Sequence, residues 1–551
     1  MTLVEFTAPT LDYVKLTPFL IVLGAACIGI LLEAFLPRRA RYATQVALSV
    51  VALLAAITMV AWHWGSAGVG LIDPQSNGDA TVLVDGPVQV MWTILFGFGL
   101  ISVLLFAERR LHSGATAFTA SAASTPGSLA ESEASGAGLV HSEVFPLALF
   151  SLSGMALFVA ANDLLVLFVG LEILSLPLYV MSGLARHRRL ISQEAALKYF
   201  LLGAAASAIF LFGVAFLFGY AGSFSYDQLA HALTFSWGRD ALLLAGMGLV
   251  SVGLLFKIGT VPFHSWVPDV YQGAPTPVTA FMSVCTKVAA VGGLLRLFYV
   301  GLGGMRWTWQ PVLAGVAILT IFVGAIIAIN QTDIKRVLAY SSIAHAGFVL
   351  VPLVGAFTIQ TGLGSGQAGS VASIMFYLIA YGFATIGCFA IVTLVRSQGR
   401  EATDLDSWAG VGRRHPVIGV SMVIFLLSLA GIPLTAGFVG KFAAFMAAWR
   451  GGYWWLALVA IVGSVIAVYI YIRVIQVMFF REPAVPEPDP VVLTESGSTP
   501  EAAGPDIVAP GTATWIVLIL CMVGTLGLGI WPGPVLDWLQ AAASFIIPTV
   551  S

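Results

Sequence analysis

The chain has 551 residues, of which 59% are hydrophobic and only 9% are charged, and its formal net charge is −2. Soluble domains carry roughly a quarter charged residues, so this chain has too few to cover a water-facing surface, and most of its surface must face lipid. The near-neutral charge argues against a nucleic-acid partner. The four cysteines form no CxxC pair spaced for zinc or an iron–sulfur cluster.

Apolar runs of about 20 residues, the length that crosses a bilayer as a helix, recur along the whole chain. The sequence therefore predicts an all-α integral membrane protein with about fourteen transmembrane helices. The runs lie near 17–36, 43–62, 87–107, 144–161, 164–184, 198–220, 241–262, 277–300, 310–329, 336–356, 371–395, 416–446, 453–480 and 513–531.

Two of these runs contain breaks built around glycine and proline. One break is Gly259-Thr260-Val261-Pro262, and the other is Gly431-Ile432-Pro433. Proline lacks the amide hydrogen that a continuous helix needs, and the second break lies well inside its run. We therefore expect two discontinuous helices.

The distribution of lysine and arginine between loops predicts the orientation. If the N-terminus faces outside, the inner loops hold fifteen lysines and arginines and the outer loops hold four. With fourteen spans, both termini are then external. Two segments on the inner side, 113–143 and 483–512, are poor in aromatic residues and are typical of flexible linkers.

Six basic residues lie within or at the ends of apolar runs, and Glu172 is the acidic residue that lies deep in one. Inserting such a residue at a helix centre costs about 2.5–3.5 kcal/mol on translocon scales. These residues must therefore be paired, hydrated or neutral. The six basic residues are Lys198, Lys257, Lys287, Arg296, Lys441 and Arg473.

Depth separates functional candidates from anchors. Glu172 lies about 13 Å past Asp163 and Lys287 about 15 Å past Pro277, at 1.5 Å per residue. Lys257 and Lys441 lie beside the two breaks, where freed carbonyl groups and water solvate a charge. Lys198, Arg296 and Arg473 lie nearer the ends of their runs, where long side chains reach the interface and anchor the helix.

One carboxylate cannot neutralise three buried lysines. A buried salt bridge that only fixes helix packing is the alternative interpretation, but it leaves Lys257, Lys287 or Lys441 without a partner. A lysine balanced between desolvation and a neighbouring charge gains and loses a proton as that charge changes, which is what a proton relay requires. His345, one turn after two serines, is a further candidate for proton transfer, although a lone helical histidine is as often only hydrogen-bonded.

Three ordered motifs resemble the antiporter-like subunits of respiratory complex I. They lie in a region of resemblance from about 144 to 480, and the VYQGAP portion is similar to the subunit N family rather than to subunits L or M. The motifs are FKIGTVPFHSWVPDVYQGAPTPV at 256–278, DIKRVLAYSSIAH at 333–345, and LSLAGIP at 427–433 followed by GKF at 440–442.

The resemblance implies two inverted five-helix repeats, at 144–300 and 310–482. Three helices within 1–112 would precede them and one helix within 513–551 would follow. Carried over residue by residue, Glu172 and Lys257 form the charge pair of a first half-channel, Lys287 is the central relay lysine, and Lys441 lies near the exit. His345 lies between the last two.

The same resemblance implies a proton-translocating membrane-arm subunit of NADH:quinone oxidoreductase in a bacterial plasma membrane. Its partners would be other membrane-arm subunits and lipid. NADH, FMN, iron–sulfur clusters and the quinone would be bound by other chains, because this one has no nucleotide-binding or haem-binding motif. The competing interpretations are a subunit of a multi-subunit sodium/proton antiporter, or of a hydrogenase or related complex with another electron donor. A purely structural membrane subunit is a further alternative.

Overall fold

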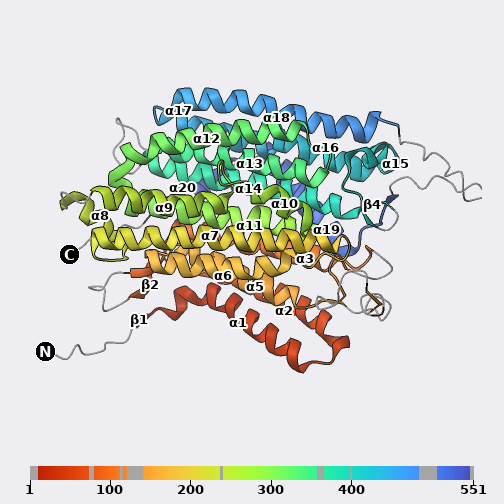
Figure 1. Ribbon diagram of the computed structural model, residues 1–551, viewed down its shortest axis with the longest axis horizontal. Coiled ribbons are helices and arrows are strands. Elements are labelled where there is room, and N and C mark those ends of the chain that lie inside the picture. Colours follow the sequence, from red (N-terminus) through yellow and green to blue (C-terminus); the bar gives the residue numbers. More distant parts are fainter. Residues whose placement is uncertain are drawn as a thin grey trace, which may run out of the picture.

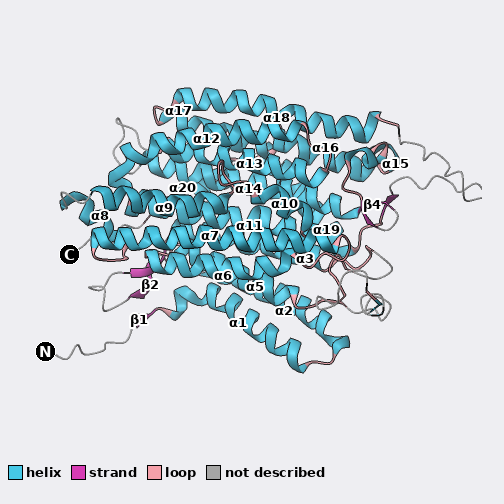
Figure 2. Cartoon of the chain, in the orientation of Figure 1, coloured by secondary structure: helices cyan, strands magenta, loops and turns pink. Residues whose placement is uncertain are grey.

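The computed structural model is a bundle of long helices that run side by side, with a small sheet at each end (Figures 1 and 2). It describes residues 10–66, 68–72, 80–111, 116–120, 128–129, 133, 140–235, 240–356, 365–397, 400–482 and 506–545. We call the end that holds the sheet of β1 (Thr10–Leu11), β2 (Gly68–Ile72) and β3 (Ala80–Val84) the β1 end. The opposite end holds β4 (Val395–Ser397), β5 (Arg400–Glu401) and β6 (Asp506–Ile507) and is the β4 end.

The long helices follow the predicted apolar runs in order, and short helices lie between or after them. In the first half they are α1 (Tyr13–Phe35), α2 (Arg38–Trp62), α3 (Gly86–Phe106), α5 (Val144–Ala160), α6 (Leu164–Ser182), α7 (Arg189–Ala221), α8 (Tyr226–Phe235), α9 (Asp240–Ile258), α10 (Trp266–Gly273) and α11 (Thr276–Arg296). In the second half they are α12 (Arg306–Ile329), α13 (Ile334–Val354), α14 (Ser365–Leu394), α15 (Val411–Arg414), α16 (Pro416–Ala430), α17 (Ala436–Arg450), α18 (Trp454–Phe480), α19 (Thr512–Ile530) and α20 (Gly533–Ala541).

The prediction of an all-α integral membrane protein is confirmed. Among the described residues, twelve helices are long and apolar enough to cross a membrane. The other two predicted runs are the 17-residue α5 and the run at 416–446, which is divided into α16 and α17 of 15 residues each. The count of fourteen crossings stays a prediction.

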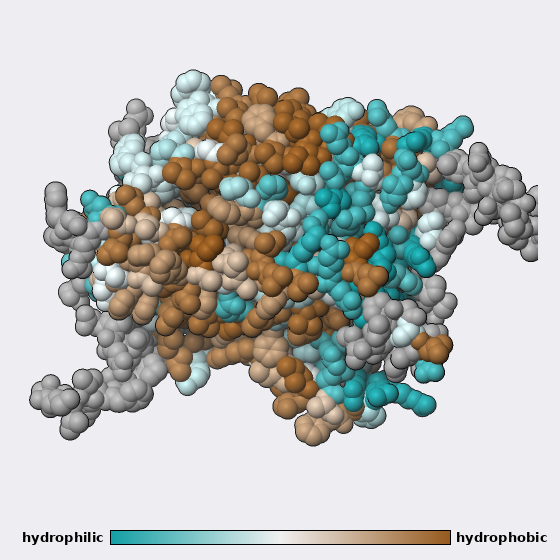
Figure 3. Space-filling view, in the orientation of Figure 1, coloured by the Kyte–Doolittle hydropathy of each residue, from teal (hydrophilic) through white to brown (hydrophobic). Residues whose placement is uncertain are grey.

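The outer surface has the polarity expected of a membrane protein. On the face shown in Figure 3, apolar side chains cover most of the helix lengths, and hydrophilic side chains gather toward the β4 end. The first and last described residues both lie at the β1 end, where Ala542 packs against Gly86 at the start of α3 (Figure 1). An even number of crossings, as the sequence predicts, would give this arrangement.

Aspartates begin several of the spans by capping them. The side chains of Asp12, Asp85, Asp163 and Asp333 accept hydrogen bonds from backbone amides in the first turns of α1, α3, α6 and α13. These amides have no partner within the helix, and a carboxylate at this position also complements the helix dipole. In these four spans, an aspartate in the sequence therefore marks the residue at which the helix begins.

The two predicted breaks are present and are built alike. After α9, the amide of Gly259 donates to Leu255 and Phe256, and after α16 the amide of Gly431 donates to Leu427 and Ser428. Gly259 has φ +83° and Gly431 has φ +85°, in the left-handed region that favours glycine. Both helices thus end in the same type of glycine cap before the chain resumes as α10 or α17.

The predicted domain boundaries stay predictions. The similar breaks fit two related halves, but they do not by themselves establish an inverted repeat. The linkers expected at 113–143 and 483–512 lie mostly outside the described residues. Of the second linker, Asp506–Ile507 form β6, which pairs antiparallel with β4.

Candidate proton-transfer site

Lys257 lies in the last turn of α9, directly before the first break, and only 4% of it is exposed. Its ammonium donates to the Ser175 hydroxyl at 2.8 Å and to the Tyr199 hydroxyl at 3.2 Å. The ring of Tyr179 also lies beside the ammonium, with its centroid 5.8 Å from Nζ. Lys257 lies at the C-terminal end of α9, where the helix dipole places partial negative charge.

Glu172 lies one turn before Ser175 on α6, but it forms no hydrogen bond with Lys257. No ion pair within 4.0 Å joins them in the described part of the chain. One carboxylate oxygen of Glu172 is buried without a hydrogen-bond partner, and Ser175 takes the hydrogen bond of Lys257 instead. A Glu172–Lys257 interaction would therefore act across a gap rather than through direct contact.

Lys287 lies in the middle of α11, a span whose interior is wholly buried. Its ammonium donates to the carbonyl oxygen and the hydroxyl of Ser342 on α13, at 2.5 and 2.7 Å. The Tyr381 hydroxyl on α14 donates to the same Ser342 hydroxyl at 2.8 Å. The Tyr381 ring centroid is 4.8 Å from Nζ, close enough for a cation–π contact.

His345 lies one turn further along α13 and bridges two tyrosines. Its Nδ1 is 2.6 Å from the Tyr377 hydroxyl, and its Nε2 is 3.2 Å from the Tyr471 hydroxyl. The Tyr471 hydroxyl is also 2.6 Å from that of Ser341. Ser342 bonds to Lys287, and the adjacent Ser341 is linked through Tyr471 to His345. The hydrogen bonds of Lys287 and those of His345 therefore meet at two neighbouring serines of α13.

Lys441 lies in α17, after the second break, and donates back across it. Its ammonium bonds to the Ala430 carbonyl at 2.9 Å and to the Ser464 hydroxyl at 2.8 Å. A small cavity of about 10 Å³ is lined by Lys441, His345 and Tyr377, among other residues. A cavity of this size has room for about one water molecule, which needs polar partners such as these to be held.

The three lysines share one property: in the described part of the chain, none has a carboxylate within 4.0 Å. Each donates instead to hydroxyl or carbonyl oxygens, which solvate an ammonium without neutralising it. Burial without a counter-ion makes the protonation state of a lysine sensitive to any charge that appears nearby. The arrangement is therefore suited to passing protons rather than to holding helices together by ion pairs.

The sequence did not single out several of the groups that connect these residues. They are hydroxyl side chains within apolar runs, and a tyrosine or serine there is as often a packing residue. The exceptions are Ser341 and Ser342, which were noted beside His345. The unanticipated groups are Ser175, Tyr179, Tyr199, Tyr377, Tyr381, Ser464 and Tyr471.

The three expected anchors differ in outcome. Lys198 is part-exposed and pairs with Asp269 at 2.8 Å, and Arg473 donates to carbonyl oxygens at the end of α12. The expectation that Arg296 reaches the membrane surface is wrong, because Arg296 is fully buried and forms an ion pair with Asp85. The position of Arg296 near the end of its apolar run suggested that the side chain reaches the interface. Asp85, which is far away in sequence, instead neutralises the charge of Arg296 inside the protein.

The described residues contain no group of three or more histidine, cysteine, aspartate or glutamate side chains placed to hold a metal ion. Lys257, Lys287, His345 and Lys441 instead lie one to a helix, on α9, α11, α13 and α17.

Comparison with known proteins decides the family. Residues 161–467 match the family model described as "NADH:quinone oxidoreductase/Mrp antiporter, TM". The NADH-quinone oxidoreductase subunit N of Cutibacterium acnes is 50% identical over 546 residues, which cover 99% of this chain and 97% of that protein. The subunit N of Nocardioides sp. is 49% identical over 545 residues, which cover 98% and 100%. The chain belongs to the NADH-quinone oxidoreductase subunit N family.

Solved structures agree with membership in the subunit N family. A chain of respiratory complex I from Thermus thermophilus is 30% identical, with a TM-score of 0.72 over 96% of this chain and 100% of that one. A chain of the Mrp complex from Dietzia has a TM-score of 0.77 over 97% of both chains, but only 21% identity. The second likeness shows a shared fold alone, so the sequence identity and not the fold separates subunit N from the antiporter scaffold.

Proposed function

We propose that this chain is a proton-translocating subunit in the membrane arm of NADH:quinone oxidoreductase. It moves protons across the membrane, driven by quinone reduction on other subunits. The observation that carries the proposal is a series of three buried lysines, Lys257, Lys287 and Lys441, each bonded to hydroxyl or carbonyl oxygens. In the described part of the chain, none of them has a counter-ion within 4.0 Å. Membership in the subunit N family indicates that the enzyme to which this subunit belongs is NADH:quinone oxidoreductase.

The relay runs in the order Glu172, Lys257, Lys287, His345, Lys441. A charge change near Glu172 alters the electrostatic energy of the Lys257 ammonium. Two charges a few ångströms apart interact by a few kcal/mol at an effective dielectric constant near 20, which is enough to change a proton equilibrium by more than tenfold. The unpartnered oxygen of Glu172 leaves this carboxylate free to respond to such a change.

The middle of the relay is its most continuous part. Lys287 bonds to Ser342, and the adjacent Ser341 begins the hydrogen-bonded group that includes Tyr471 and His345. Between His345 and Lys441 lies the small cavity of about 10 Å³, where a water molecule would complete the path. Between Lys257 and Lys287 the relay also needs water, because no direct hydrogen bond joins their side chains in the described residues.

The remaining assignments follow from the same role. The chain holds no cofactor of its own, and NADH, FMN, iron–sulfur clusters and quinone are bound by other subunits. Its partners are the other membrane-arm subunits and lipid. The chain is a multi-pass protein of the bacterial plasma membrane, with the β1 end and both termini outside, because the loops at the β4 end hold most of the arginines.

Replacing Lys257 with methionine tests the relay. Methionine keeps the length of the side chain but cannot carry a proton, so the assembled complex should lose most of its proton pumping. Pumping is measured in sealed inverted membrane vesicles with a pH-sensitive dye, at matched NADH oxidation. Arg450→Met, at an exposed position on α17, is the matched control and should pump normally.

Assembly is measured in parallel by native-gel separation and mass spectrometry. NADH-oxidising, flavin and iron–sulfur subunits should migrate with this chain. A band that holds only antiporter-type subunits would move the function to sodium/proton exchange, and one with hydrogenase subunits would change the electron donor. Wild-type pumping in a correctly assembled Lys257→Met complex would rule out the relay.

A further inference from the structure

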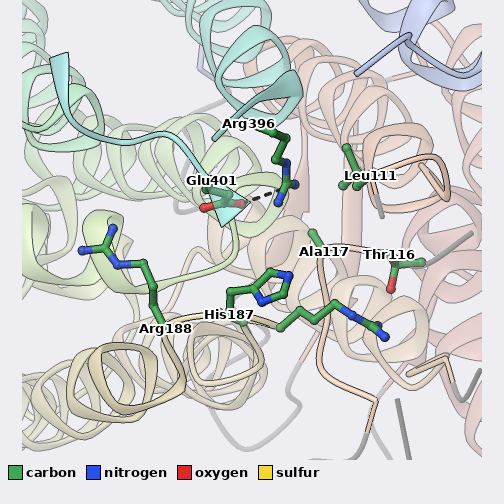
Figure 4. Close-up of a pocket in the computed structure, with 9 residues that line it drawn as sticks. Leu111, Thr116, Ala117, His187, Arg188, Arg396 and Glu401 are labelled. Carbon is green, nitrogen blue, oxygen red and sulfur yellow. Dashed lines mark ion pairs between the residues drawn. The ribbon is translucent and has the colours of Figure 1, made fainter. Parts of the chain in front are cut away.

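A small pocket lies at the β4 end of the bundle, apart from the residues of the relay (Figure 4). Three segments distant in sequence form its walls: the chain after α3, the turn between α6 and α7, and the hairpin of β4 and β5. About 20 Å³ of the pocket is open to the centre of a water-sized group, which is room for one small ion or a water molecule rather than for a larger ligand. The lining residues are Leu111, Thr116, Ala117, Ala185, Arg186, His187, Arg188, Arg396 and Glu401.

Arg396 is the central feature of this pocket. Only 5% of it is exposed, and its guanidinium points into the space between Glu401 and His187 (Figure 4). Its Nε donates to the Thr393 carbonyl at 3.2 Å, but its Nη2 is buried without a hydrogen-bond partner. A buried donor without an acceptor is costly, so this nitrogen is a position where an acceptor from outside would be stabilised.

The charges around Arg396 do not balance. Among the described lining residues, Glu401 is the one carboxylate, and its oxygens lie 3.9 Å from Arg396 and 3.7 Å from Lys335. One carboxylate is therefore shared between two buried cations. Arg188, whose side chain is 32% exposed, forms an ion pair with Asp333 at 3.9 Å and donates to the Thr403 hydroxyl at 2.8 Å. The pocket thus carries a positive excess beside its own acid.

We propose that this pocket binds a phosphate-type oxyanion. The guanidinium fork of Arg396 matches the geometry of phosphate oxygens, and a dianion or monoanion there supplies the negative charge that Glu401 alone does not. The group is carried either by an anionic phospholipid of the leaflet at the β4 end or by free phosphate. Both sources present the same oxygens to Arg396, and anionic lipid is abundant at the inner membrane surface.

Local hydrogen–deuterium exchange of the purified complex tests this proposal. Exchange is measured in peptides that cover the α6–α7 turn and the β4–β5 hairpin, with inorganic phosphate or with phosphatidylglycerol nanodiscs. The controls are chloride at equal ionic strength and phosphatidylcholine nanodiscs. At ten times the dissociation constant, binding lowers opening-limited exchange by about tenfold. Slowing by phosphate identifies the free anion, and slowing by phosphatidylglycerol alone identifies the lipid.

Three variants make the result specific. Arg396→Gln should raise the anion concentration needed for half-maximal slowing about tenfold or more, because a charge-assisted hydrogen bond is lost. Glu401→Gln should shift the same midpoint to lower concentration, since it removes a competing negative charge. Arg400→Gln, an exposed arginine on β5 that does not line the pocket, should leave it unchanged.

The opposite directions expected for Arg396→Gln and Glu401→Gln separate anion binding from a general loss of folding. Slowing that persists in Arg396→Gln overturns the proposal. It is equally overturned if neither anion alters exchange in the wild-type complex, since the pocket would then be closed by protein or hold only water.

Discussion

Lys287 donates to both oxygens of Ser342, at 2.5 Å to the carbonyl and 2.7 Å to the hydroxyl. The carbonyl bond fixes the ammonium against α13, and the hydroxyl bond connects it to a group that both accepts and donates. Tyr381 donates to the same hydroxyl, so helices α11, α13 and α14 meet at one serine side chain. The position of the central lysine is therefore set by a residue 55 positions away in sequence.

Ser342→Ala should lower proton pumping while the complex assembles. The Lys287 ammonium keeps its carbonyl acceptor but loses one charge-assisted hydrogen bond, which is worth about 1.5–3 kcal/mol and corresponds to a tenfold or larger effect if this transfer limits the rate. The measurement is pumping per NADH oxidised in sealed vesicles. Ser342→Thr, which keeps the hydroxyl, should recover most of the activity. Equal pumping by the alanine variant and the wild type would remove Ser342 from the path.

Gly431→Ala should destabilise the second break and disturb Lys441. A Cβ at this position would lie 2.8 Å from Lys441 Cδ, and the left-handed φ of +85° adds about 1–2 kcal/mol. Gly452→Ala is a matched control, because Gly452 has φ +83° with nothing within 4 Å of its added Cβ. We expect weaker pumping only in Gly431→Ala, with thermal stability of the complex measured for both variants. Identical behaviour of the two would mean that contact with Lys441 does not matter.

Arg296→Met should destabilise the protein by about 3–5 kcal/mol, because it leaves Asp85 buried without its cation. Asp85 also caps α3, so the start of that helix should loosen. The amount of this chain in the assembled complex, read from native gels after a temperature series, reports the loss. The double variant Asp85→Asn with Arg296→Met should recover part of it. Normal heat resistance of the single variant would contradict the pairing.

Glu401→Gln should destabilise the β4–β5 hairpin at neutral pH and lose this effect in acid. Burial alone would raise the pKa of Glu401, but Lys335 and Arg396 dominate and lower the pKa below its ordinary 4.5. A carboxylate with a lowered pKa stabilises the folded state above pH 4.5, and its contribution is lost as the pH falls through the folded-state value. Hairpin hydrogen exchange in the variant and the wild type should therefore converge below pH 4.5. A constant difference down to pH 3 would exclude this linkage.

The sequence by itself determined the fold class, the approximate spans and the two breaks. Each is local information: apolar length fixes a span, an aspartate caps it, and a glycine before a proline ends it, as at Gly259 and Gly431. The candidate residues Lys257, Lys287, His345 and Lys441 were also visible in the sequence, because a charge or a histidine in an apolar run is rare enough to stand out.

Only the tertiary structure decided what those residues touch. Ser342 bonds to Lys287, Tyr471 bonds to His345, and Asp85 neutralises Arg296 from 211 positions away. Serine, tyrosine and aspartate are ordinary residues until a distant helix brings a partner within 3 Å or so, the range in which a hydrogen bond forms. The spacing and rotation of the helices determine which side chains come into contact. Both depend on the packing of the whole bundle rather than on any one segment.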